Sequence, residues 1–301
     1  MRRARASIVP SVRRWYRRHG RSLPWRGETD PYRIILSEIM LQQTQVSRVL
    51  KAYPRFLRRF PSMRSLARGP KREVILAWRG MGYNNRAVRL HALASVIVRR
   101  GMSIPATAET LLELPGIGKY TAYAILASVH GLPVPVVDVN IRRLLSRVFW
   151  RMPSTADMRN EREIWHTAEE ILPRRNVYDW NQALMDIGAT ICTARRPSCR
   201  VCPLGAVCRS RTSMIQPAPG ARKREPGLRG VPDRIYRGRI VEALRNRRRG
   251  STAEALGRAI DPEFSRRDAS WLGNLLKALE RDGLIRLSPG KTALRSRVVI
   301  A

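Results

Sequence analysis

Leu114-Pro-Gly-Ile-Gly-Lys-Tyr-Thr-Ala-Tyr-Ala-Ile-Leu126 is the stretch of this chain that decides the fold. A helical pattern ends at Leu114, a Pro-Gly pair interrupts it, and a second helical pattern resumes at Tyr120. The stretch therefore predicts two helices joined by a tight glycine turn. Gly116 and Gly118 permit backbone angles that other residues avoid, and they leave backbone N–H groups open to an approaching phosphate.

A Pro-Gly-x-Gly turn is often only a connection between helices, so its meaning depends on the residues near it in the chain. The downstream segment is Val136-Val-Asp-Val-Asn-Ile-Arg142, in which Asp138 comes after an apolar run. A carboxylate in such surroundings is rare unless it has a partner or a task. Asp138 is therefore a candidate functional residue, and the turn is a candidate clamp for a DNA backbone.

The composition indicates a polyanionic partner. The 301 residues include 58 Lys and Arg against 23 Asp and Glu, a formal net charge of +35, and 44% are hydrophobic, enough for two domains. A basic proteome, a GC-rich coding bias or a ribosome-associated protein would give a similar excess, so charge alone names no activity. No stretch approaches the roughly 18 apolar residues of a membrane span, and the arginine-rich start lacks the apolar core of a signal peptide. We expect a cytoplasmic, nucleoid-associated monomer with no membrane partner.

A second candidate carboxylate lies on an earlier predicted helix, from Tyr32 to about Leu41. Asp30-Pro-Tyr supplies its N-cap and a proline at the favoured first position. The apolar positions of this helix surround one acid, Glu38, which by itself is typical of a solvated surface residue. The helix runs into Met40-Leu-Gln-Gln-Thr-Gln-Val46, and such a cluster of neutral amides is suited to reading base edges and filling the space of an extruded base.

Several motifs in a fixed order make a resemblance specific. They are Leu23-Pro-Trp-Arg26, Asp30-Pro-Tyr32, Ser37-Glu-Ile-Met-Leu-Gln-Gln-Thr44, Gly80-Met-Gly-Tyr83 with Arg86 after it, and Asn181-Gln-Ala-Leu-Met-Asp-Ile-Gly-Ala189. Together with the glycine turn and Asp138, they resemble the adenine DNA glycosylases of the helix-hairpin-helix superfamily, the MutY type. The matches cover roughly two thirds of the chain.

The chain between these motifs reads as helices without sustained apolar–polar alternation, which predicts an all-α fold. The predicted helices are 8–19, 32–41, 45–60, 71–79, 85–99, 108–114 and 120–130. The resemblance implies two lobes: a six-helix bundle with the helix-hairpin-helix over residues 27–133, and an iron–sulfur cluster lobe formed by 1–26 together with 134–211. Asp138 would lie where the lobes meet, facing Glu38 across a cleft.

The four cysteines are clustered with a spacing of 6-2-5: Cys192, Cys199, Cys202 and Cys208. In a cytosolic chain such clustering indicates metal rather than disulfides. A zinc ribbon would normally pair two Cys-x2-Cys knuckles, and only one occurs here. In the glycosylase superfamily this arrangement holds a [4Fe–4S] cluster, and the resemblance implies the same cofactor here, in a structural role.

The resemblance also implies roles for individual residues. Glu38 would protonate adenine at N7, Asp138 would stay ionised and stabilise the positively charged sugar, and Asn140 would orient this pair. Tyr83 would wedge into the duplex. The residues that would contact the DNA or the flipped adenine are Arg26, Gln43, Gln182, Gly116 and Gly118.

Position 120 separates two reaction types. In the related glycosylase–lyases of the endonuclease III type, a lysine at this position attacks the sugar and leads to strand cleavage. Here the residue is Tyr120, and Lys119 would point about 100° away around the helix. We therefore expect a monofunctional enzyme that hydrolyses the N-glycosidic bond of adenine mispaired with 8-oxoguanine or guanine in double-stranded DNA.

The C-terminal part departs from the best-known family members. Residues 212–234 are rich in Pro, Gly and Arg and predict a linker, and residues 235–301 predict a winged-helix-like module. Its expected elements are helices over 235–247, 253–260 and 270–282 and a hairpin over 283–294. The usual longer domain, which contacts the oxidised guanine, does not fit here, so strict 8-oxoguanine selectivity does not follow. Arginines such as Arg245 are expected to follow phosphates, the alternative being a module for stability or partner docking.

Two other functions stay open. A thymine or uracil mismatch glycosylase of the same superfamily also carries tyrosine at position 120, although Glu38 within its glutamine-rich motif is not expected there. A non-catalytic DNA-binding regulator would fit the C-terminal module, but it would have no use for both carboxylates and all four cysteines.

Overall fold

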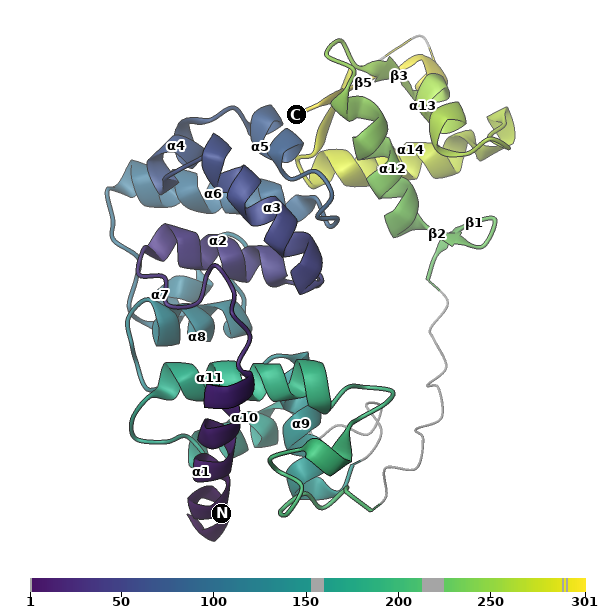
Figure 1. Cartoon of the computed structure of the whole chain (residues 1–301). Helices are drawn as coiled ribbons and strands as arrows, with labels where there is room; N and C mark the ends of the chain where they lie inside the picture. Colours follow the sequence, from purple (N-terminus) through teal and green to yellow (C-terminus); the bar gives the residue numbers. More distant parts are fainter. Residues whose placement is uncertain (1, 153–159, 213–224, 289, 291) are drawn as a thin grey trace. The chain divides into compact units, whose positions relative to one another are not determined.

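The computed structural model describes residues 2–152, 160–212, 225–288, 290 and 292–301, and most of them are helical (Figure 1). The all-α fold is confirmed, because the described chain is mostly helical. Its short strands all fall after residue 226. By contact density the chain divides into two compact units. The first consists of residues 1–34, 105–113 and 117–222, and the second of 35–104, 114–116 and 223–301. The domain boundaries expected from the sequence stay predictions.

The first unit packs its helices around one buried cluster. Its helices are α1 (Arg2–His19), α7 (Ala108–Leu112), α8 (Lys119–Ser128), α9 (Val139–Trp150), α10 (Glu161–Glu170) and α11 (Val177–Asp186), then the one-turn π-helix η1 (Ile187–Ile191) and the 3-10 turn η2 (Cys199–Val201). Ile141, Leu144, Trp180 and Ile187 are fully buried in the cluster, so the apolar faces of α9, α11 and η1 meet there. The core therefore adjoins the segment that carries Asp138.

The second unit begins with the helices that carry Glu38 and the glutamine-rich motif. These are α2 (Pro31–Leu41), whose first turn belongs to the first unit, α3 (Val46–Arg59), α4 (Met63–Arg68), α5 (Lys71–Ala77) and α6 (Asn85–Arg100). Helix α4 was not predicted. It begins with a capping box in which the Ser62 and Ser65 side chains satisfy each other's backbone N–H groups.

The C-terminal module has the expected three helices with a small sheet. Its elements are β1 (Gly227–Leu228), β2 (Val231–Pro232), α12 (Asp233–Arg245), β3 (Ser251–Thr252), α13 (Ala253–Ile260), η3 (Arg266–Asp268), α14 (Ala269–Arg281), β4 (Ile285–Ser288), η4 (Ala293–Arg295) and β5 (Arg297–Ile300). The three-stranded antiparallel sheet has the order β3-β5-β4, with Ile285 opposite Ile300.

The structure differs from the local predictions for this region at two places. The partner of β4 is β5, so the hairpin extends to residue 300 rather than ending at 294. Of the predicted linker, residues 213–224 lie outside the described residues, and its last part forms the β1–β2 pair and the start of α12. Pro232 precedes that helix, and a proline and glycine content that suggests a linker is equally compatible with a tight hairpin.

Candidate active site

The glycine turn forms between α7 and α8, and its two positions differ in how strictly they require glycine. Gly116 has φ 79°, and a Cβ there would lie 2.9 Å from Arg89 Cβ, so both the angle and the space require glycine. Gly118 has φ −102°, which any residue can adopt, and a Cβ there would meet nothing within 4 Å. Gly118 is the N-cap of α8 and supplies no side-chain cap, so the open space lies next to uncapped N–H groups suited to a phosphate.

Asp138 is held at the start of α9 by its own carboxylate. Oδ1 accepts the Ile141 N–H at 2.7 Å, and Oδ2 accepts from Asn140 Nδ2 at 2.7 Å. Burial raises the pKa of Asp138, while these bonds and nearby Arg143 work in the opposite direction. Arg143 Nη2 also donates to Asn140 Oδ1 at 3.0 Å, so the structure brings Asp138 and Asn140 together, with Arg143 behind them.

Asn181, which has no role in the sequence-based hypothesis, fixes the backbone that leads to Asp138. It is 2% exposed, its Oδ1 accepts the Val136 N–H at 3.2 Å, and its Nδ2 donates to the Val134 carbonyl at 3.0 Å. Gly188 allows close packing against Asn140 in the same region, because a Cβ there would lie 2.9 Å from Asn140 Cβ. The signal in the sequence was an amide on the apolar face of α11, where an amide needs a buried partner.

The structure brings Arg26 and Gln182 together, beside an acid, Asp186, that the sequence did not single out. Arg26 Nη2 and Nη1 donate to the two carboxylate oxygens of Asp186 at 2.7 and 2.8 Å, and its Nε donates to Gln182 Oε1 at 3.1 Å. Arg21 adds a backbone and a side-chain bond to the same carboxylate at 3.0 and 2.7 Å. All donor nitrogens of Arg26 therefore have protein partners, and its contact with a flipped adenine stays a prediction.

Asp186 is fully buried, and its charge is compensated. Burial would oppose ionisation, but the bonds from Arg26 and Arg21 outweigh it and lower the pKa of Asp186. A buried ion pair of this kind contributes to a unique arrangement, because neither partner can move without leaving the other charge unpaired.

The second unit contains Glu38 and the two residues expected to probe DNA, Gln43 and Tyr83. Glu38 is 8% exposed on α2, so the alternative of a solvated surface residue is wrong. Gln43 and Tyr83 have φ of 53° and 42°, the left-handed region that non-glycine residues seldom occupy. Such backbone persists only where surrounding contacts hold it, and it is frequent at functional positions.

The support for both of these residues is Arg86. Its guanidinium is buried and donates to the carbonyls of Ile39 at 2.9 Å and Gln42, and to Thr44 Oγ1 at 2.7 Å. The same guanidinium also donates to the Met81 and Gly82 carbonyls, both at 3.3 Å. Burial lowers the pKa of Arg86 to about 10. One side chain therefore joins the turn that carries Gln43 to the turn that carries Tyr83.

Tyr120 and Lys119 point in different directions, as the helix geometry predicts. Tyr120 packs against a buried cluster that includes Ala124 and Val136. Lys119 Nζ lies 4.3 Å from the centre of the Trp165 ring and 4.0 Å from a Glu161 carboxylate oxygen.

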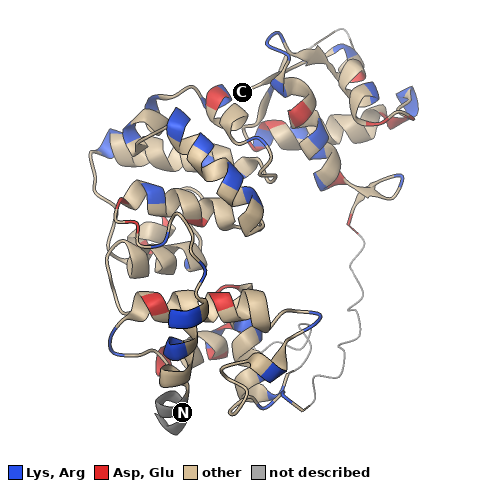
Figure 2. Ribbon diagram, viewed as in Figure 1, with Lys and Arg blue, Asp and Glu red and all other residues tan. Residues whose placement is uncertain are grey.

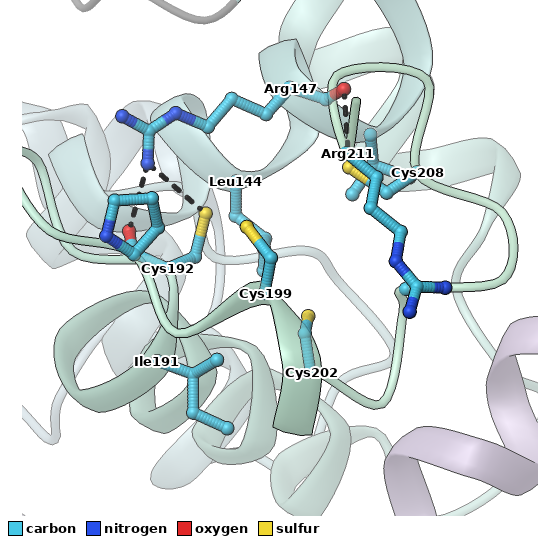
Figure 3. Close-up of a pocket in the computed structure, with 11 residues that line it drawn as sticks. Leu144, Arg147, Ile191, Cys192, Cys199, Cys202, Cys208 and Arg211 are labelled. Carbon is cyan, nitrogen blue, oxygen red and sulfur yellow. Dashed lines mark hydrogen bonds between the residues drawn. The ribbon is translucent and has the colours of Figure 1, made fainter. Parts of the chain in front are cut away.

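All four cysteines line one cavity, together with Leu144 and Arg147 (Figure 3). None of them forms a disulfide. Burial raises the pKa of the Cys202 thiol to about 11 and also raises that of Cys208, so thiolates there need compensating positive charge. Within the described part of the chain, no three His, Cys, Asp or Glu side chains converge closely enough to hold a single metal ion.

Arginines connect this cavity to the Asp138 region. Arg147 Nη1 donates to the Sγ and to the carbonyl of Cys192, both at 3.4 Å (Figure 3). It also donates to the Thr193 carbonyl at 2.7 Å. Arg143, which contacts Asn140, donates from Nε to the Cys192 carbonyl at 2.8 Å. The cysteine loop and the capped carboxylate are therefore parts of one hydrogen-bonded arrangement.

The fold and these sites define a class of protein that acts on DNA bases. The family model described as the HhH-GPD superfamily of base excision DNA repair proteins matches residues 36–170. Among solved structures, a thermostable thymine-DNA glycosylase has a TM-score of 0.65 and 30% identity, covering 70% of this chain and 98% of its own. A trapped endonuclease III–DNA covalent intermediate, at 20% identity and a TM-score of 0.61 over 71% of this chain and 98% of its own, shares the fold.

Relatives with longer sequence matches narrow the class. The adenine DNA glycosylase of Mycobacterium tuberculosis is 36% identical over 283 residues, which are 93% of this chain and 91% of that protein. The adenine DNA glycosylase of Homo sapiens is 37% identical over 216 residues, 68% of this chain and 40% of its own. The chain belongs to the adenine DNA glycosylase family of the HhH-GPD superfamily.

None of the described helices is long and apolar enough to cross a membrane.

Proposed function

We propose that this protein removes adenine mispaired with 8-oxoguanine or guanine from double-stranded DNA by hydrolysing the N-glycosidic bond. The observation that carries the proposal is the Asp138 carboxylate, fixed at the start of α9 by Ile141 and Asn140 in a chain whose relatives are adenine DNA glycosylases. The thymine or uracil alternative is not favoured, because curated relatives matched over most of the chain carry the adenine activity in their names.

The proposed chemistry uses two carboxyl groups in different protonation states. Glu38, buried on α2, gives a proton to adenine N7, and the electron pair of the C1′–N9 bond leaves with the base. Asp138 stabilises the positive charge that develops on the sugar. Water then adds to C1′ and loses a proton, which leaves adenine and an intact strand with an abasic site.

The reaction is proposed to stop at base removal. No amine occupies position 120, where Tyr120 stands, and the Lys119 amine lies against Trp165 and Glu161. A Schiff base with the sugar, which strand cleavage requires, therefore has no nucleophile at this position.

The four cysteines are proposed to hold a [4Fe–4S] cluster. Thiols that surround a cavity, rather than converge on a point, suit a cluster with several metal atoms better than a single zinc ion. Cys192, Cys199, Cys202 and Cys208 would be its ligands, and the cluster would supply the cross-link that fixes this loop. Arg147, which donates to Cys192 Sγ, would offset the negative charge of a thiolate ligand.

Base release tests the function directly. Duplexes carrying A, T, U or G opposite guanine or 8-oxoguanine are incubated with the full-length protein as a monomer, and the released base is identified. Adenine alone should be released. Release of thymine or uracil would favour the alternative glycosylase, and duplex binding without release of any base would indicate a DNA-binding regulator in the nucleoid.

A further inference from the structure

Helix α12 of the C-terminal module ends on an arginine that is buried against other helices of the second unit. Arg245 is 6% exposed, and its Nη1 donates to the carbonyls of Ile75 and Leu76, the latter at 2.9 Å. These carbonyls lie at the C-terminal end of α5, where a helix has unpaired acceptors and a partial negative charge. The expectation that Arg245 follows DNA phosphates is therefore wrong, because its guanidinium is occupied by protein carbonyls.

Apolar packing accompanies this arginine. Ile75 of α5 is fully buried in one cluster with Ile240 and Leu244 of α12 and with residues of α14. At the turn after α14, a Cβ on Gly283 would lie 3.3 Å from Val88 of α6. The module is therefore packed on α5 and α6, and a buried apolar contact of this kind keeps two elements in one arrangement.

Arg245 also reaches the turn that carries Tyr83. Its Nη2 donates at 3.2 Å to Oδ1 of Asn84, the residue between Tyr83 and the first residue of α6. Gly80, Gly82 and Tyr83 have φ of 85°, 68° and 42°, so the turn has little regular structure of its own. A turn with this backbone keeps its shape only through its anchors.

We propose that Arg245 is a positioning residue for Tyr83, so that the C-terminal module sets the conformation of the side chain expected to enter the duplex. Arg86 anchors the turn from within the bundle, and Arg245 anchors it from the module. Tyr83 is 46% exposed and borders a groove of about 520 Å³ that is also lined by Gln43 and by Arg234 and Arg237 of α12. The inference deepens the proposed function, and it rests on that function for the nature of the substrate.

The matched pair Arg245→Met and Arg281→Met tests the contact itself. Both remove one positive charge from the C-terminal module, but Arg281 is exposed. Hydrogen exchange of the backbone amides over residues 79–85 should accelerate about tenfold or more in Arg245→Met and stay unchanged in Arg281→Met. Equal exchange in the two variants would overturn the proposal. If Arg245→Met does not fold, Asn84→Ala removes the acceptor in the turn alone and should show the same acceleration.

A double-mutant cycle separates positioning from a general structural effect. Single-turnover adenine release is measured for Arg245→Met, Tyr83→Ala and the combined variant. Arg245→Met should slow release about tenfold when Tyr83 is present and less than about twofold when it is absent, because the two residues act as one unit. A tenfold loss in both backgrounds would overturn the proposal.

A binding readout keeps this inference distinguishable from the proposed function. A duplex with 2-aminopurine beside the mismatch gains fluorescence when an inserted side chain unstacks it, whether or not a base is released. Arg245→Met should give a smaller rise than Arg281→Met. If this difference appears but no variant releases adenine, the positioning role stands and the proposed function fails. If adenine is released and the two variants give the same rise, the positioning role fails.

Discussion

Asp138 is the residue on which the proposed chemistry depends most. Its carboxylate accepts from the Asn140 amide, Asn140 accepts from Arg143, and Arg143 donates to the carbonyl of Cys192. Consecutive hydrogen bonds of this kind restrict the carboxylate to one orientation before DNA arrives. Substitution of Asp138 by asparagine keeps the size of the side chain but removes its charge and one of its two acceptor oxygens.

Asp138→Asn and Glu38→Gln should each lower single-turnover adenine release by about a thousandfold or more, because one loses the stabilising charge and the other the acid. Duplex affinity should stay within about threefold in both variants, since neither change removes a phosphate contact. The measurement is base release at saturating enzyme, beside a binding titration. Asp179→Asn, at an exposed position, is the matched control and should behave as wild type. Turnover retained by either variant would place the chemistry on other residues.

Asp186→Asn should destabilise the fold by about 3–5 kcal/mol at pH 7, because it leaves Arg26 and Arg21 without their buried counter-charge. The folded-state pKa of Asp186 is lowered, so its stabilisation is present above the unfolded value of about 3.9 and is lost as the pH falls through the folded value. Urea unfolding of both proteins over a pH series measures this. The gap should be constant near neutrality and narrow below about pH 3.9, whereas a gap that widens in acid would contradict it.

The candidate functional residues that could be recognised from the sequence differ in kind from those that could not. Asp138 could be singled out because a carboxylate after an apolar run is locally anomalous, and Glu38 because the glutamine-rich motif follows it directly. Asn181 and Asp186 were missed, although they lie in a quoted motif, because their partners are at least 45 positions away in the chain. Nothing local to such a residue indicates whether a distant backbone segment or an arginine will meet it.

At the scale of elements, the residues that start and end helices made the helices of the C-terminal module predictable. Helix α13 spans the predicted residues 253–260, and the predicted ends of α14 and α12 lie within one or two residues of the observed ends. These ends could be predicted because Gly, Pro and Ser mark the limits of the helices. No residue ranges were predicted for α4, α9, α10 and α11, and the partner of β4 was not predicted. A six-residue helix has too little periodicity to detect, and strand pairing across the sheet is a non-local choice.

The glycine turn offers a matched pair of substitutions. Gly116→Ala should cost about 1–3 kcal/mol of stability, because its φ is positive and its Cβ would clash with Arg89. Gly118→Ala should change stability by less than about 0.5 kcal/mol, since the site is open. It should nevertheless weaken duplex binding, because the methyl group obstructs the N–H groups of α8. Unfolding curves and a binding titration test both, and an unaltered affinity in a folded Gly118→Ala would contradict the clamp.

The cysteine loop predicts the colour and content of the protein. Protein purified without air should be brown, with about four irons and four sulfides per chain. Cys202→Ala should lower iron content and DNA affinity before it affects the intrinsic rate of base release, because the loop lies outside the reacting groups. Metal analysis and visible absorption measure this, and stoichiometric zinc in place of iron would contradict it.

At the scale of the whole molecule, positive charge is spread widely. Lys and Arg, drawn blue in Figure 2, occur on most of the described helices, and Asp and Glu are far fewer. The turn after α12 concentrates three exposed arginines, Arg247, Arg248 and Arg249. Their exposure contrasts with the burial of Arg245, so the phosphate contacts of this module are expected from these three and from the exposed Arg266 and Arg267.

Changing these three arginines to glutamine should weaken binding to every duplex similarly. Each lost phosphate contact should reduce the slope of log affinity against log salt by about 0.9. The measurement is a binding titration at two or more salt concentrations with matched and mismatched duplexes. An unchanged slope at an unchanged melting temperature would show that these three arginines only face solvent.

The shared cluster around Ile75 has a consequence for how the chain is made. Ile75 emerges from the ribosome about 160 residues before Tyr236, Ile240 and Leu244, which complete its surroundings. At about 5–20 residues per second, synthesis leaves α5 without these partners from α12 for roughly 8–30 seconds. During that interval the nascent chain exposes an apolar surface that chaperones recognise, and a premature stop codon in the last helices would leave that surface exposed for the life of the product.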